Sequence, residues 1–188
     1  MSTLISIKCY NTYIEDYILG VKGMAFKIDS KVDYSGLDKI MKNMARLTER
    51  EVSVGYDDTP HSDGNSMADI AGWQEEGVRA RSGEEGAWHI PPRPFMDMAS
   101  SIWASDIEKE SAKVVSSALK GNESVLNKNL GLIGESGRES IQAAIDTQQF
   151  TKLSPTTIRI KRAKNSRFPE TILVDSGKLY EGMSVKIK

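Results

Sequence analysis

A histidine among carboxylates is the first group of residues in this sequence that could do chemistry. His61 lies in the polar segment 57–63 together with three aspartates. Imidazole and carboxylate groups can bind a divalent cation or transfer protons. The spacing matches neither a calcium loop nor a zinc site, so we favour a solvated acidic loop over a metal site. His89, a lone imidazole beside Trp88, is interpreted as a packing or hydrogen-bonding residue.

Two possible nucleophiles lack the surroundings that catalysis requires. Ser136 lies in the sequence GESG, whereas a nucleophile elbow needs Gly-x-Ser-x-Gly on a strand-to-helix turn. Cys9 alternates with apolar neighbours in a predicted strand, where a small buried hydrophobe is the common role. The chain has no phosphate-binding loop and no dinucleotide-binding glycine motif. We therefore expect a protein that is not an enzyme, with no catalytic residues, cofactor or metal; a hydrolase using His61 or His89 is the least favoured alternative.

Composition predicts a single soluble globular unit. The chain has 188 residues, of which 39% are hydrophobic and 27% charged, so it can bury a substantial core. Its 25 Lys and Arg residues balance 26 Asp and Glu residues, so no net field attracts nucleic acid or membrane. A single cysteine is typical of a reducing compartment. The start of the chain does not resemble a secretory signal and no apolar run is long enough to span a bilayer, so we expect a soluble cytoplasmic protein.

The periodicity of apolar residues predicts an α+β fold, with a small mixed or antiparallel sheet packed against two long helices plus shorter helices. Alternation predicts strands at 4–9, 25–33, 51–56 and 183–187. Helical spacing and caps predict helices at 37–47, 66–76, 94–121, 123–147 and 154–164. Three glycines should interrupt the fourth helix near Gly134. Residues 1–35 are assigned as a β-rich extension and 36–188 as the main domain.

Three further segments have backbone-specific signals. The stretch 78–89 contains two glycines among charges and is predicted to be a flexible loop. This loop is followed by the sequence IPPRPF at 90–95, whose three prolines make a stiff, extended strut. Asp175, Ser176 and Gly177 are expected to form a turn before a few helical residues.

Charge is segregated along the chain. Residues 57–85 contain eight carboxylates and two arginines, whereas 151–167 contain six basic residues and no acid. The basic segment could contact phosphates, form a solvated helix face, or meet the acidic segment of a neighbouring subunit. Because aromatic residues are not interleaved with the cations, we favour the solvated or protein-contact interpretation over nucleic-acid binding.

Two pairs of segments together resemble one family. Residues 67–77 (MADIAGWQEEG) followed by 90–96 (IPPRPFM) resemble the pattern A-x-I-A-x-x-x-E-x-G … I-P-x-R-P-F of tailed-phage tail-completion and virion-morphogenesis proteins. Residues 153–161 (LSPTTIRIK) and 172–179 (ILVDSGKL) are similar to that family's ending, L-S-P-x-T-I-x-x-K … L-x-D-T-G-x-L, with Ser176 in place of the usual threonine. The resemblance extends from about Leu37 to Lys188 and leaves residues 1–35 without a counterpart.

The resemblance implies a non-enzymatic structural protein of the virion, at the neck or head-proximal end of the tail. It implies self-association into a ring, expected to be a hexamer, around a channel through which DNA passes without sequence-specific binding. The implied partners are the tail tube or tail terminator and the head-completion or neck proteins, and no membrane is involved. The alternative is a small DNA-binding module that uses the basic segment 152–167. Candidate interface residues, each of which could instead have a role within the fold, are Trp73, Glu76, Arg81, Trp88, Arg93, Phe95, Lys161 and Arg162.

Overall fold

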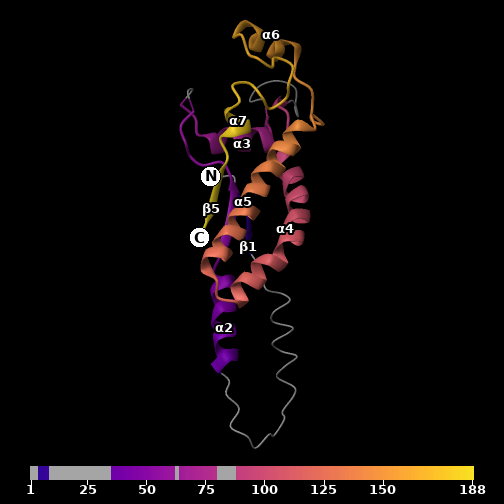
Figure 1. The fold of residues 1–188 in the computed structure, drawn as a ribbon. Coiled ribbons are helices and arrows are strands. Elements are labelled where there is room, and N and C mark those ends of the chain that lie inside the picture. The colour runs from indigo at the N-terminus through magenta and orange to yellow at the C-terminus, as the bar shows by residue number, and fades with distance from the viewer. Residues whose placement is uncertain (1–3, 9–34, 62–63, 80–87) are drawn as a thin grey trace, which may run out of the picture.

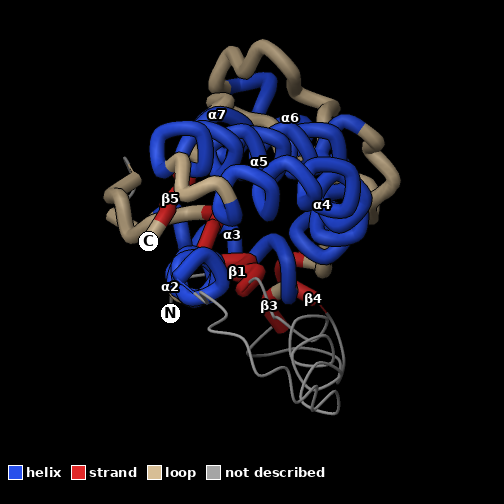
Figure 2. The backbone as a smooth tube through the Cα atoms, turned by 60° about the horizontal axis from the view of Figure 1, so that its bottom comes forward, coloured by secondary structure: helices blue, strands red, loops and turns tan. Residues whose placement is uncertain are grey.

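The computed structural model describes residues 4–8, 35–61, 64–79 and 88–188. Two long helices, α4 (Phe95–Leu119) and α5 (Glu123–Asp146), pack against each other and α5 also packs on the sheet. Figures 1 and 2 show these helices side by side, with the strands on one side of them. Shorter helices surround this centre, so the predicted α+β fold, with a small sheet against two long helices, is confirmed.

The main sheet has three antiparallel strands in the order β1-β2-β5. Strand β2 (Glu51–Gly55) is central, with β1 (Leu4–Lys8) and β5 (Ser184–Ile187) at the edges. The central position explains why Val52 and Val54 are buried. Three of the predicted strands are confirmed, and the fourth, at 25–33, lies outside the described residues. Residues 4–8 of the segment assigned as an extension belong to this sheet.

Helix α5 is continuous, so the predicted interruption near Gly134 is wrong. The glycines are positions where the helix closely approaches its neighbours. A Cβ atom on Gly134 would lie 2.2 Å from Cγ1 of Val185, and one on Gly137 would lie 2.7 Å from Cε2 of Trp103. Gly131 has nothing within 4 Å of that position. Two of the three glycines therefore allow close packing, and the tertiary contacts outweigh their low helix propensity.

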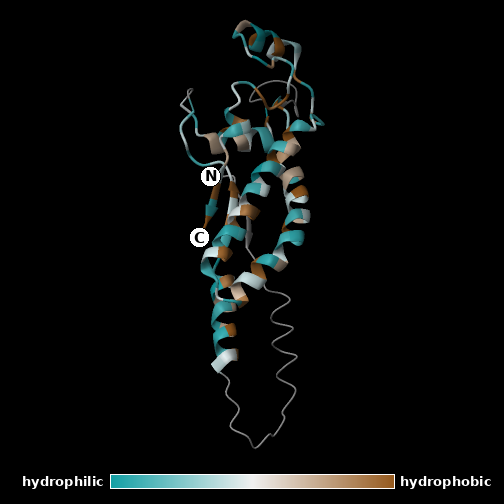
Figure 3. Ribbon diagram, in the orientation of Figure 1, coloured by the Kyte–Doolittle hydropathy of each residue, from teal (hydrophilic) through white to brown (hydrophobic). Residues whose placement is uncertain are grey.

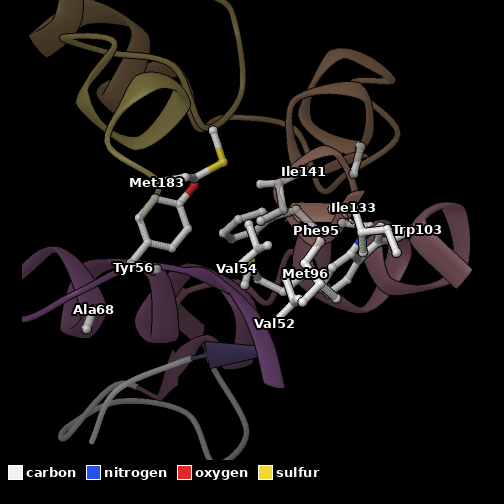
Figure 4. Close-up of a cluster of buried hydrophobic side chains, with 14 of the residues drawn as sticks. Val52, Val54, Tyr56, Ala68, Phe95, Met96, Trp103, Ile133, Ile141 and Met183 are labelled. Atoms are coloured by element: carbon white, nitrogen blue, oxygen red, sulfur yellow. Dashed lines mark hydrogen bonds between the residues drawn. The ribbon is translucent and has the colours of Figure 1, made fainter. Parts of the chain in front are cut away.

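The core lies where β2, α4 and α5 meet (Figure 4). Trp103 is 2% exposed, and its indole Nε1 donates a hydrogen bond of 2.9 Å to the carbonyl oxygen of Ile133. Trp103 and Ile133 lie side by side, while Tyr56 points toward Met183. The Tyr56 hydroxyl donates to the carbonyl oxygen of Leu179 at 2.5 Å, and burial raises the pKa of this phenol. The first of these contacts joins α4 to α5, and the second joins the end of β2 to the C-terminal segment.

The shorter helices begin and end largely as their caps predict. Helix α2 (Ser35–Thr48) matches the helix expected at 37–47. Helix α3 (Met67–Glu76) begins after Ser66, whose hydroxyl accepts from the Asp69 amide, and ends at Gly77. Helix α6 (Pro155–Ala163) is capped in the same way by Ser154, and α7 (Lys178–Glu181) follows Gly177, whose φ is 84°. Side-chain caps and the first-turn proline are local signals, which is why they could be identified from sequence.

The segment predicted as a flexible loop begins and ends in paired strands. Strand β3 (Val78–Arg79) pairs antiparallel with β4 (Trp88–Ile90), and residues 80–87 between them lie outside the described residues. In the part of the chain that is described, no helix is long and apolar enough to cross a membrane.

Candidate functional site

The two halves of the first motif bind each other where α3 ends and α4 begins. The backbone amide of Arg93 donates to the carbonyl oxygen of Gln74 at 2.7 Å. The Arg93 guanidinium Nη1 also donates to the side-chain oxygen Oε1 of Gln74, at 2.7 Å. The proline strut is thereby fixed against the last turn of α3. We use the name α3–α4 clasp for four residues at this junction: Gln74, Glu75, Arg93 and Phe95.

Glu75 supplies the cap that α4 lacks locally. Pro94 occupies the N-cap position of α4 and offers no side-chain hydrogen bond. Instead, the two carboxylate oxygens of Glu75 accept from the amides of Met96 at 2.8 Å and Asp97 at 3.0 Å. These amides have no partner within the helix, and a negative charge at this end is favourable for the helix dipole. Burial raises the pKa of Glu75, while the two amide donors act in the opposite direction.

The clasp also extends into the core and toward the C-terminal part of the chain. Phe95 is fully buried, and its ring contacts that of Tyr56 edge-on, with centroids 6.2 Å apart. Arg93 is 6% exposed, and its Nε donates to the carbonyl oxygen of Thr151 at 3.3 Å. Burial lowers the pKa of Arg93. Arg93 and Phe95 were considered either as interface residues or as residues with a role within the fold. The structure shows contacts of both side chains within the fold.

The second motif has a similar internal function. Lys161 in α6 is 7% exposed, and its Nζ donates to the carbonyl oxygens of Thr171 at 2.8 Å and Val174 at 2.6 Å. Burial lowers the pKa of Lys161, and the charge of Asp175 opposes this effect. The interpretation of Lys161 as part of an exposed basic face is therefore wrong. The side chain instead holds the irregular segment that leads to α7.

The other candidate interface residues are distributed over the surface. Trp73 is 40% exposed on α3, and Glu76 is exposed at the end of the same helix. Arg162 is exposed on α6, where it forms an ion pair with Glu170. Trp88 is the first residue of β4, and Arg81 lies outside the described residues. Trp73, Glu76 and Arg162 remain available for contacts with another molecule.

Several carboxylates of the acidic segment are also used within the fold. Asp57 pairs with Lys186, and this contact and a hydrogen bond from Ser184 hold the pKa of Asp57 below its usual value. Asp69 accepts from the Ser66 hydroxyl at 2.8 Å. With Glu75 engaged in the clasp, the acidic segment offers fewer free charges to a neighbouring subunit than the sequence indicates.

The possible catalytic residues that the structure describes lie on separate elements of the fold. Ser136 lies within α5 and donates to the carbonyl oxygen of Ile133 at 2.9 Å, so it is not on a strand-to-helix turn. The backbone of His61 closes a turn with Asn65, and His89 is exposed in β4. Within the described residues, no three His, Cys, Asp or Glu side chains are grouped as metal ligands. Cys9 lies outside the described residues.

Two cavities lie along the helices, away from both histidines. One, of about 280 Å³, lies between α2 and the turn that joins α4 to α5, and its lining includes Asn43, Arg46 and Glu123. The other, of about 270 Å³, lies between α4 and α5 beside Leu132 and Ser136.

Comparison of the chain with protein-family models, curated proteins and solved structures gives no match in any of the three.

The capping role of Glu75 was not predicted from the sequence. The motif marks this residue, but its partners are the amides of Met96 and Asp97, more than 20 positions along the chain. The available signal was the start of α4 at a proline, a residue that cannot cap with its side chain. A helix that begins in this way needs an acceptor from elsewhere in the fold.

We expect Glu75→Gln to destabilise the protein by about 1–2 kcal/mol, since one of the two amides would face an NH₂ group instead of an acceptor. Glu76→Gln, the matched control on the exposed neighbour, should change the free energy of unfolding by less than about 0.5 kcal/mol. Urea unfolding followed by circular dichroism measures both values. Equal effects of the two substitutions would contradict the capping role.

Proposed function

We propose that this chain is a structural protein of a tailed-phage virion that completes the head-proximal end of the tail and helps to join it to the head. It acts without a catalytic cycle, as a ring of identical subunits, expected to be a hexamer, around the DNA channel. Its partners are the tail tube or tail terminator on one side and the head-completion or neck proteins on the other. The protein is expected in the virion, after assembly in the host cytoplasm.

The observation that carries this proposal is the α3–α4 clasp. Two of the residues that produce the resemblance connect the end of α3 to the start of α4: Arg93 donates to Gln74, and Glu75 accepts from the Met96 amide. Phe95, the first residue of α4, packs against Tyr56 in the core. The motif therefore corresponds to one three-dimensional unit and not to scattered similarities. Strand β4 leads directly into the prolines of this segment and pairs with β3, which follows α3, so the clasp adjoins this pair of strands.

The arrangement of surface residues further supports a role in assembly. Among the described residues, several large apolar side chains are 40–51% exposed, including Trp73 on α3 and Leu37 on α2. The polar groups of the motifs, by contrast, bind backbone atoms of the same chain. A protein with exposed apolar surface and internally satisfied motif residues is organised for contacts with macromolecules.

The direct test is quantitative mass spectrometry of purified particles from a phage or induced prophage that encodes the chain. A low, constant copy number relative to the major tail protein is expected. Deletion of the gene should leave heads and tails unjoined in electron micrographs, and expression in trans should restore infectious particles. Absence of the chain from infectious particles would overturn the proposal.

One observation favours the alternative of a small DNA-binding module. Arg159, Lys164 and Arg167 are exposed on or just after α6, and the Arg167 guanidinium lies 5.3 Å from the centre of the half-exposed Phe168 ring. In nucleic-acid-binding proteins, cations contact the phosphates and exposed aromatic rings stack on the bases. Duplex affinity that falls steeply with salt would support this alternative, and absence of binding at low salt would exclude it.

A further inference from the structure

The segment 151–170, which contains α6, concentrates positive charge at one end of the molecule. It holds six of the 25 cations of the chain and one of its 26 acids, Glu170, which leaves 19 cations and 25 acids elsewhere. The segment therefore has a formal charge of +5, and the rest of the chain a formal charge of −6. We call residues 151–170 the α6 arm. Figure 1 shows α6 beyond the end of α5, apart from the long helices.

The surface of the α6 arm combines free cations with apolar side chains. Lys152, Arg159 and Lys164 are exposed and form no ion pair with the described residues. Ile160 and Phe168 are 48% and 45% exposed, and Figure 3 shows hydrophobic and hydrophilic residues side by side on α6. Such a surface is suited to a protein surface that is acidic and offers apolar contacts as well.

The base of the α6 arm is held in one position by side chains that bind the backbone. The side-chain oxygen of Gln148 accepts from the Ile172 amide at 2.7 Å, and its Nε2 donates to the Ile172 carbonyl oxygen at 3.1 Å. Lys161 donates to two carbonyl oxygens of the segment 171–174. Leu173 has a φ of 62°, which a bulky residue keeps only where its surroundings hold it. The arm is therefore fixed where its free cations meet no acid of their own chain, and an acidic partner surface must come from another molecule.

The two long helices offer an acidic surface of this kind. Together α4 and α5 contain eight carboxylates and four cations. Glu108 on α4 and Glu139 on α5 are exposed and form no ion pair with the described residues. A second copy of the chain therefore presents the charge that the α6 arm lacks. DNA is the less favoured partner, because a chain with a net charge of −1 exerts no long-range attraction on it.

We propose that the α6 arm of one copy binds the acidic surface of α4 and α5 on a second copy. The two surfaces differ, so each copy can bind one neighbour through its arm and another through its long helices. A head-to-tail contact of this kind can close into a ring. This inference deepens the proposed function and rests on its self-association. Its tests use the free, full-length protein, whereas the role in the virion is tested on particles, so failure of one can be distinguished from failure of the other.

The first test is sedimentation equilibrium over a series of protein and salt concentrations. The wild type should associate, and less strongly at high salt, because salt screens the opposite charges. Arg159→Glu combined with Lys164→Glu should raise the dissociation constant about tenfold or more, since like charges would then face each other. Lys39→Glu combined with Lys42→Glu is the matched control, with the same charge change on α2 at the opposite end of the molecule (Figure 1), and should associate like the wild type. All four side chains are exposed, so thermal unfolding of the variants should be unchanged.

The second test identifies the surface that the α6 arm contacts. Phe168 is exposed and aromatic, so the photoreactive analogue benzoylphenylalanine can take its place with little change in shape. A mixture of ordinary and isotope-labelled protein is irradiated, and the cross-linked peptides are analysed by mass spectrometry. Cross-links between differently labelled copies, from the α6 arm to peptides of 95–146, are expected.

Three results would overturn the proposal. The first is a wild type that stays monomeric at every concentration and salt; if this monomer binds duplex DNA and Arg159→Glu with Lys164→Glu abolishes that binding, the α6 arm belongs to the DNA-binding alternative. The second is cross-linking between two α6 arms, which would indicate a two-fold contact. The third is association that the two double variants affect equally.

Discussion

Gly137→Ala is expected to destabilise the protein by about 2 kcal/mol, although alanine is the better helix former. The new Cβ would lie 2.7 Å from Cε2 of Trp103 and 2.9 Å from Cγ2 of Val54, closer than such contacts normally allow. Both neighbours are buried, and the Trp103 ring is held by its hydrogen bond to Ile133. Overpacking a core costs about 1–3 kcal/mol or more, which exceeds the gain of up to about 1 kcal/mol in helix propensity.

Gly131→Ala provides the matched control on the same helix. Nothing lies within 4 Å of a Cβ at this position, so only the propensity gain remains. This substitution should stabilise the protein by up to about 1 kcal/mol, opposite in sign to Gly137→Ala. Urea denaturation of both variants, followed by circular dichroism, measures the difference. If both substitutions stabilised the protein to a similar extent, the close approach of α5 to its neighbours would be contradicted.

The glycines of α5 also show why part of the fold could not be predicted from sequence. Helix propensity is a property of the residue and its near neighbours, and by that measure Gly134 and Gly137 weaken a helix. Their value here arises from Val185 and Trp103, which belong to other elements. Caps such as Ser66 and Ser154 are local and could be recognised, whereas packing between distant segments could not.

The same distinction applies to the candidate site. The resemblance identified the segments that contain Arg93, Phe95 and Lys161, but it did not show whether their side chains face another molecule or their own core. Charge alone indicates an exposed lysine, because buried lysines are rare. The structure places Lys161 under the segment 171–174, where two carbonyl groups need donors. Burial and backbone hydrogen bonding depend on tertiary structure, and the sequence pattern contains neither.

Lys161→Met is expected to reduce the free energy of unfolding by about 2 kcal/mol. Methionine retains much of the apolar stem but removes the ammonium group that donates to Thr171 and Val174. Each carbonyl left without a donor in a buried site costs about 1–3 kcal/mol, and the relief from no longer burying a charge offsets part of this loss. Chemical denaturation gives the total change, and amide exchange in residues 171–179 should show that the loosening begins in this segment.

Arg162→Met is the control for Lys161→Met. It also removes a positive charge from α6, but it leaves the hydrogen bonds of Lys161 intact. Arg162 is the next residue of α6 and is exposed, with only a surface ion pair to Glu170. Surface pairs contribute about 0–1 kcal/mol, so this control should change stability by less than about 0.5 kcal/mol. Equal losses in both variants would show that Lys161 acts through its charge and not through the two carbonyls. The distinction decides how α6 can be tested in assembly, because a defect caused by Lys161→Met would reflect folding, whereas one caused by Arg162→Met would report on the exposed surface.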